Sequence, residues 1–259
     1  MTYDYYGQGQ SRLRFFAERI TWGTRRLILA NLIVFVGQLI VDVPWGRMPG
    51  MAPGGAFVYD WLMFAPGRFL HHFHGFIWQP FTYMFLHASL WHLFRNMLWL
   101  FIFGPMVERR LGTRQFLRFY ILCGALGVLA TYLRLKTPAA PVLGASGAVM
   151  GVLMAAAIAD PDRQIFLFPF PIPINMRALI FIVVAFDIVS ALGGGHTSVA
   201  THIGGLAVAL CYMKLAPPIR RWVRTLKREH EPPNSNKDPI GEAVDKIFDF
   251  EEERRRRQR

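Results

Sequence analysis

Six apolar segments recur along this chain of 259 residues, and each is close to the length of a helical membrane span or somewhat shorter. A helix needs roughly 20 predominantly apolar residues to cross the hydrocarbon core of a bilayer. The segments cover residues 27–43, 90–106, 116–133, 146–159, 177–192 and 199–216. Since a helix satisfies its own backbone hydrogen bonds inside lipid, the pattern predicts an all-α polytopic membrane protein, a bundle of six transmembrane helices.

The distribution of charge supports a membrane protein rather than a nucleic-acid-binding one. Hydrophobic residues make up 53% of the chain, and the net charge is +12. The basic residues do not line one polar face, as nucleic-acid binding would require, but flank the apolar segments. They cluster before the first segment, after the second and after the sixth, whereas residues 193–198 contain neither Lys nor Arg. The positive-inside rule therefore places both termini in the cytoplasm, with Arg134 and Lys136 as a minor exception.

Three regions follow from this organisation. Residues 1–26 form a cytoplasmic N-terminal segment without the features of a signal peptide, residues 27–216 the six-helix membrane core, and residues 217–259 a cytoplasmic tail. The long connection over residues 44–86 is rich in aromatic residues, which predicts an interfacial loop between the first two spans. The tail is either solvated or a short amphipathic helix on an anionic membrane, because its apolar residues recur at helical spacing: Ile240, Val244, Ile247 and Phe248.

Two small-residue motifs each contain one residue capable of catalysis. Ser146 lies in Gly144-Ala145-Ser146-Gly147 at the start of the fourth segment, and His202 lies in Thr201-His202-Ile203-Gly204-Gly205 within the sixth. Taken singly, each motif is more typical of helix packing. On a helix, each motif forms a ridge of small residues. Two helices that pack along these small-residue ridges could bring a serine hydroxyl within hydrogen-bond reach of an imidazole, which is the requirement for an activated serine.

A third polar group stands at the start of the second segment. His92 and Asn96 are four residues apart, so they share one face of a helix and could form an oxyanion hole. A metal site is the alternative, because five of the eight histidines lie in this region, but no carboxylate stands at zinc-ligand spacing from them. Those five are His71, His72, His74, His87 and His92.

The ordered set of motifs resembles the rhomboid family of intramembrane serine proteases. The resemblance runs from about Trp78 to Ala216, and the separations suit the family. It rests on Phe81-Thr82-Tyr83-Met84-Phe85-Leu86-His87, His92, Asn96, Val107-Glu108-Arg109-Arg110-Leu111-Gly112, Gly144-Ala145-Ser146-Gly147 and His202-Ile203-Gly204-Gly205.

The resemblance implies roles for these residues. Ser146 matches the nucleophile and His202 the general base, while His92, Asn96 and the backbone N–H of Ser146 match the oxyanion hole. His87, Gly144 and Gly147 match structural positions near the site, and Glu108 and Arg110 match a charged pair that braces the second and third spans. The family uses no metal or organic cofactor, and its substrates are single-span membrane proteins.

Several positions depart from the family pattern, and a further residue, Asp187, adds a charge within an apolar segment. Met150 replaces an aromatic that stacks near the histidine, Thr201 replaces an alanine, and Arg95 occupies a position that is usually apolar or small. Asp187 is a carboxylate inside the fifth segment, to which we assign a structural role because the family works with a Ser-His pair.

The motifs and the resemblance together predict an intramembrane serine endopeptidase, which stands against two alternatives. These are a non-catalytic relative that binds membrane proteins and a six-span transporter or metal carrier. A bacterial inner membrane is the expected location, and the sequence leaves the oligomeric state open.

Overall fold

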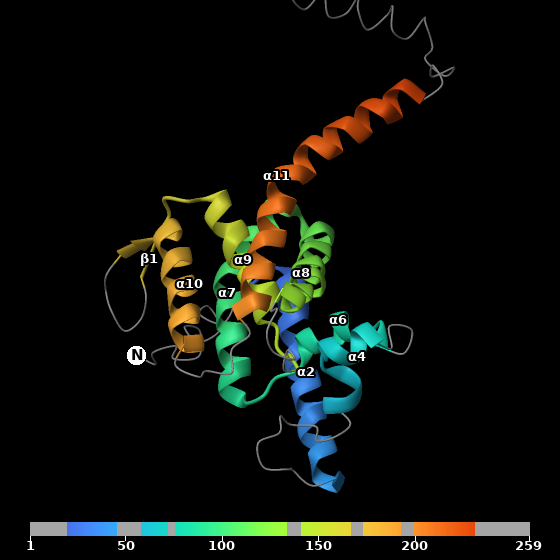
Figure 1. Cartoon of the computed structure of the whole chain (residues 1–259). Coiled ribbons are helices and arrows are strands. Elements are labelled where there is room, and N and C mark those ends of the chain that lie inside the picture. Colours follow the sequence, from blue (N-terminus) through green and yellow to red (C-terminus); the bar gives the residue numbers. More distant parts are fainter. Residues whose placement is uncertain are drawn as a thin grey trace, which may run out of the picture. The chain divides into compact units, whose positions relative to one another are not determined.

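The computed structural model describes residues 20–45, 58–71, 76–133, 141–166, 173–192 and 199–230. Helices predominate among them (Figure 1). The long ones are α2 (Trp22–Trp45), α7 (Leu90–Leu111), α8 (Thr113–Gly127), α9 (Ser146–Ala159), α10 (Met176–Leu192) and α11 (Val199–His230), and a 3-10 helix, η3 (Val128–Leu133), extends α8. All six apolar segments lie in these helices. The possible amphipathic helix of the tail lies outside the described residues.

The chain divides into two compact units, Met1–Lys214 and Leu215–Arg259, so α11 contributes to both. The site and the packing described below belong to the first unit. Among the described residues, one helical stretch, Trp22–Val41, is long and apolar enough to cross a membrane by itself. The helices Ser146–Ala159 and Val199–Leu215 are apolar but shorter.

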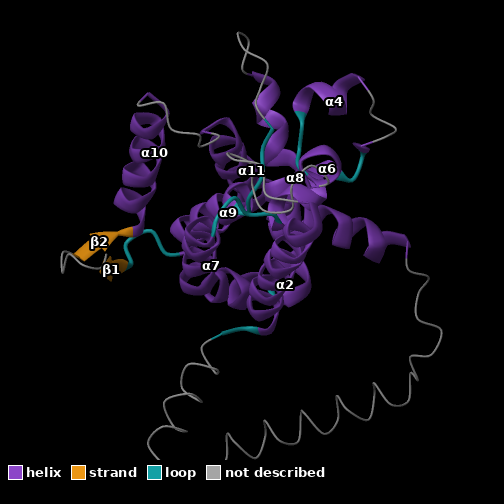
Figure 2. Cartoon of the chain, turned by 90° about the horizontal axis from the view of Figure 1, so that it is seen from below, coloured by secondary structure: helices purple, strands orange, loops and turns teal. Residues whose placement is uncertain are grey.

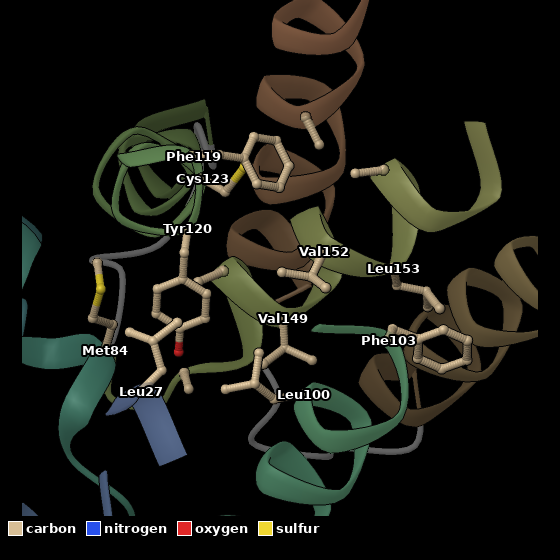
Figure 3. Packing of buried hydrophobic residues seen from close by; sticks show 14 of the residues in the cluster. Leu27, Met84, Leu100, Phe103, Phe119, Tyr120, Cys123, Val149, Val152 and Leu153 are labelled. Atoms are coloured by element: carbon tan, nitrogen blue, oxygen red, sulfur yellow. The ribbon is translucent and has the colours of Figure 1, made fainter. Parts of the chain in front are cut away.

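The core forms around α9, which packs against α7, α8 and α10. A helix that is apolar on all sides is typical of a protein core or a membrane span, and α9 buries most of its residues. Its Val149, Val152 and Leu153 meet Leu100 of α7 and Tyr120 of α8 in one cluster (Figure 3). This central position fixes the first turn of α9, where Ser146 lies.

The connection before α7, for which the sequence predicts an interfacial loop, is partly helical where the structure describes it. It contains a π-helical turn η1 (Val58–Leu62), two short helices α4 (Pro66–His71) and α6 (Gln79–Thr82), and a 3-10 turn η2 (Tyr83–Phe85). Trp61 and Trp78 stack at 6.5 Å between ring centroids, and the Trp78 indole N–H donates to the Trp61 carbonyl at 2.8 Å. Both indoles are exposed, as aromatic residues at a membrane interface are.

A small sheet interrupts the all-helical pattern predicted from the sequence. Strands β1 (Gln164–Phe166) and β2 (Pro173–Asn175) pair antiparallel between α9 and α10, with Ile165 opposite Ile174. The Asn175 side chain accepts a hydrogen bond from the Ala178 N–H and so caps the start of α10. Three-residue strands are too short to show a hydropathy period, so the sequence pattern did not predict them.

Glu108 and Arg110 do not pair with each other as the family resemblance implies. The Glu108 carboxylate accepts hydrogen bonds from the backbone N–H groups of Gly23 and Thr24, each at 2.8 Å, and from the hydroxyls of Thr21, Thr24 and Thr113. Arg110 donates instead to the Ala159 carbonyl at 2.9 Å. The two side chains therefore tie α7 to the start of α2 and to the end of α9, because each satisfies orphan backbone groups at a helix end.

Glu108 lies just beyond the second apolar segment, and its environment favours the ionised form. Burial alone would raise the pKa of its carboxyl group. The hydrogen bonds from Thr21, Thr113, Gly23 and Thr24 outweigh burial and hold the pKa below the usual 4.5.

Candidate active site

Ser146 is the first residue of α9, immediately after a sharp backbone turn. Gly144 has φ +119°, a conformation that residues with a Cβ rarely adopt, and its N–H donates to the Tyr83 carbonyl at 2.9 Å. The turn delivers Ser146 to the helix N-terminus, where backbone N–H groups have no intrahelical acceptor. Such groups suit a developing negative charge on a substrate oxygen.

The turn carrying Ser146 lies directly against α11. A Cβ built on Gly147 would lie 2.8 Å from Thr201 Cγ2, and one built on Gly205 would lie 2.0 Å from the Gly147 carbonyl oxygen. The close approach of the two small-residue ridges, predicted from the sequence, is therefore confirmed. Ser146 and His202 each adjoin a residue of this contact, Gly147 and Thr201 respectively.

A third helix joins the contact, which the sequence analysis missed. A Cβ on Gly204 would lie 2.2 Å from the Gly127 carbonyl oxygen at the end of α8. A Cβ built on Gly127 would lie 2.8 Å from the backbone nitrogen of Gly205. The small residues Gly124, Ala125 and Gly127 in the third apolar segment were the available signal.

His202 is buried, with 6% of its surface exposed, and its ring nitrogen Nδ1 lies 2.6 Å from Oδ2 of Asp187. Asp187 comes from α10, which both views place at the edge of the helices, beside β1 and β2 in Figure 2. The carboxylate we assigned a structural role therefore touches the candidate base directly. Within the described residues, the structure shows no hydrogen bond between Ser146 and His202, a contact that often forms only with substrate bound.

His92 and Asn96 lie together at the start of α7, as their spacing predicts. The His92 ring covers Gly144, where an added Cβ would lie 2.6 Å from His92 Cε1, so the ring stands over the backbone that leads to Ser146. Asn96 is buried and its Nδ2 lies 3.1 Å from His87 Nε2. Because an amide nitrogen only donates, His87 Nε2 accepts, and one N–H of Asn96 remains for another partner.

Two further side chains support this region, and the sequence analysis assigned neither of them a role. Gln38 of α2 clamps the main chain of His87: its Oε1 accepts from the His87 N–H at 3.0 Å, and its Nε2 donates to the His87 carbonyl at 3.3 Å. Tyr83 donates its hydroxyl to the Gly124 carbonyl at 2.8 Å. A glutamine inside an apolar segment was a usable signal, because buried amides need partners.

The remaining candidates occupy less central positions. Arg95 is exposed, and Met150 is half-buried against the core cluster. Among the described residues, no group of three or more His, Cys, Asp or Glu side chains is placed to hold a metal ion. His72 and His74, part of the metal alternative, lie outside the described residues.

Comparisons with known proteins bear on this arrangement. A family model described as the rhomboid domain matches residues 74–218. Rhomboid protease GlpG of Haemophilus influenzae is 29% identical over 147 residues, which cover 56% of this chain and 72% of that protein. Rhomboid protease GlpG of Salmonella paratyphi A is 30% identical over 139 residues, which cover 52% of this chain and 46% of that protein. Since the family match spans more than half of the chain, the chain belongs to the rhomboid family of intramembrane serine proteases.

Proposed function

We propose that this rhomboid-family protease hydrolyses peptide bonds in or near transmembrane segments, with Ser146 as nucleophile and His202 as general base. The observation that carries the proposal is the contact of Gly147 with Thr201 and Gly205. It brings the first turn of α9 against the turn of α11 that contains the imidazole. Two helices in such close contact can bring a serine hydroxyl within hydrogen-bond reach of an imidazole, which is what an activated serine requires.

The chemistry follows from the groups around Ser146. His202 takes the hydroxyl proton as Ser146 Oγ attacks the scissile carbonyl, and the same proton passes to the leaving amine. The negative oxygen is held by the Ser146 N–H, the free N–H of Asn96 and the His92 ring. Water then attacks the acyl-enzyme, with His202 again as base. A substrate helix must unwind locally first, because its carbonyls are already bonded within the helix.

The membrane arrangement is part of the proposal. The six long helices cross the bilayer, both termini face the cytoplasm, and the membrane is the bacterial inner membrane. Large apolar side chains project outward from several helices, with exposed fractions of 70% for Ile33 on α2, 69% for Leu90 on α7 and 76% for Phe181 on α10. Such surfaces suit contact with lipid rather than water. The substrates are single-span membrane proteins, which can reach the site sideways through the lipid.

The test compares wild type with Ser146→Ala and His202→Ala in liposomes that contain a model single-span substrate. Ser190→Ala, which removes a hydroxyl from α10, is the matched control. We expect cleavage by wild type and Ser190→Ala, and loss of cleavage in the other two by at least about 1,000-fold. A fluorophosphonate probe should label wild type but not Ser146→Ala. Equal cleavage by wild type and Ser146→Ala would refute the proposal.

A further inference from the structure

The helix α10 presents two very different surfaces. Four apolar side chains on it are strongly exposed, namely Phe181, Phe186, Val189 and Leu192. Asp187 is the one acidic residue of the helix and is buried, with 9% of its surface exposed. The helix therefore turns its carboxylate inward, toward His202, while it turns its large apolar side chains outward.

The burial of this carboxylate needs a compensating contact. Withdrawing a carboxylate from water is costly, and removing its partner leaves that cost uncompensated. In the described part of the chain, the recorded partner is His202 Nδ1 at 2.6 Å, and the side chains of the pair are 12% and 8% exposed. Replacing a whole buried ion pair by apolar side chains is often neutral for stability, so stability alone gives no reason to place a carboxylate there. Its contact with the candidate base points to a role in the reaction.

The hydrogen bond dictates which imidazole nitrogen can act as a base. A carboxylate only accepts, so Nδ1 of a neutral His202 must carry the ring hydrogen. The lone pair then lies on Nε2, the nitrogen on the other side of the ring. When Nε2 takes the Ser146 proton, the ring becomes a cation beside the carboxylate, which stabilises it without taking the proton itself.

We propose that Asp187 is a positioning residue, which fixes the tautomer and orientation of His202 through the hydrogen bond between Asp187 Oδ2 and His202 Nδ1. This inference rests on the proposed roles of Ser146 and His202. Asp187 acts on the base and has no contact with substrate. The working unit is then three residues from three helices: Ser146 on α9, His202 on α11 and Asp187 on α10.

The kinetic test uses the full chain in liposomes and the near-isosteric variant Asp187→Asn, with Ser190→Ala on the same helix as control. An amide can present its N–H to Nδ1 and so favour the wrong tautomer. We expect kcat to fall about 10- to 1,000-fold while KM changes less than about twofold, because the hydrogen bond acts on the chemical step. Ser190→Ala should match wild type. A carboxylate that served only to hold α10 in place would change KM or folding instead of kcat alone.

A spectroscopic measurement keeps the inference testable if Asp187→Asn folds poorly. In protein labelled with ¹⁵N-histidine, the His202 signals are identified by their loss in His202→Gln, at about pH 8.5, where an ordinary imidazole is neutral. We expect Nδ1 to be protonated and Nε2 unprotonated in wild type. The opposite tautomer, or a kcat of folded Asp187→Asn equal to wild type, would overturn the inference. Equal cleavage by wild type and Ser146→Ala would instead refute the proposed function, and the tautomer would still report on the Asp187 contact.

Discussion

The two sides of His202 are built on different physical principles. Toward Ser146, α11 packs closely against α9: Gly205 faces the Gly147 carbonyl oxygen and Gly147 faces Thr201, with no room for an added carbon. Toward α10, a hydrogen bond between His202 Nδ1 and Asp187 Oδ2 links the imidazole to a helix with a largely exposed apolar surface. Close packing fixes distances, whereas a hydrogen bond fixes an orientation. Substitutions on the first side should therefore damage structure and activity together, and those on the second should affect activity with the structure retained.

The largest effect is expected from Gly205→Ala. The new methyl group would lie 2.0 Å from the Gly147 carbonyl oxygen, so α9 and α11 must separate. We expect activity to fall more than about 100-fold and the free energy of unfolding to drop by about 3 kcal/mol, at the upper end for overpacking. Thermal unfolding and substrate cleavage measure the two effects. Gly37→Ala on α2, where nothing lies within 4 Å, is the control and should retain full activity. A Gly205→Ala protein with wild-type activity would contradict the close contact.

Gly144→Ala should have the next largest effect, because it combines strain with a clash. The residue has φ +119°, and the added methyl group would lie 2.6 Å from His92 Cε1. Gly112→Ala separates the two causes, since Gly112 has φ +78° but open space around it. Both variants should lose about 1–3 kcal/mol of stability from backbone strain. Only Gly144→Ala should also lose cleavage, by about 10-fold or more, because His92 is displaced. Equal activity of the two variants would remove His92 from the proposed site.

A smaller effect, with a distinctive pH dependence, is expected from Glu108→Gln. Because the folded protein holds the pKa of Glu108 below 4.5, ionised Glu108 stabilises the fold fully at pH above the unfolded value. This stabilisation disappears as the pH falls through the lower, folded pKa. We expect Glu108→Gln to lower stability by about 1–3 kcal/mol at neutral pH, and the difference from wild type to shrink below pH 4.5. Thermal unfolding across this range measures it. A difference that grows on acidification would contradict the assigned direction.

The smallest effect is expected from Met150→Leu. Met150 is half-buried against the core, and a swap that conserves volume usually costs under about 1.5 kcal/mol. If Asp187 orients His202, the side chain at position 150 need not, so kcat should stay within about twofold of wild type. If Met150→Leu lost as much kcat as Asp187→Asn, the residue that orients His202 would be Met150 on α9 and not Asp187 on α10. Steady-state cleavage of the same substrate by both variants decides between them.

The sequence by itself determined the helical segments, the family and the two small-residue ridges. These are local or ordered patterns: apolar runs, residues four apart on one helix face, and motifs in a fixed order. The family assignment is confirmed by the match over residues 74–218. The predominance of helix is confirmed as well. The strands β1 and β2 add a small sheet, which could not be predicted because each strand has only three residues.

Only the tertiary structure decided which polar groups meet. Asp187 and His202 are 15 residues apart across a helix connection, and Glu108 lies 84 residues from Thr24. No periodicity relates such positions, because their contact depends on how whole helices pack. The sequence could therefore predict Ser146 and His202 as the catalytic residues and identify Asp187 as a charged residue whose burial in an apolar segment is energetically unfavourable. The packing of α10 decided that the Asp187 carboxylate points toward the His202 imidazole. A buried carboxylate is stable only where a hydrogen-bond donor lies within reach.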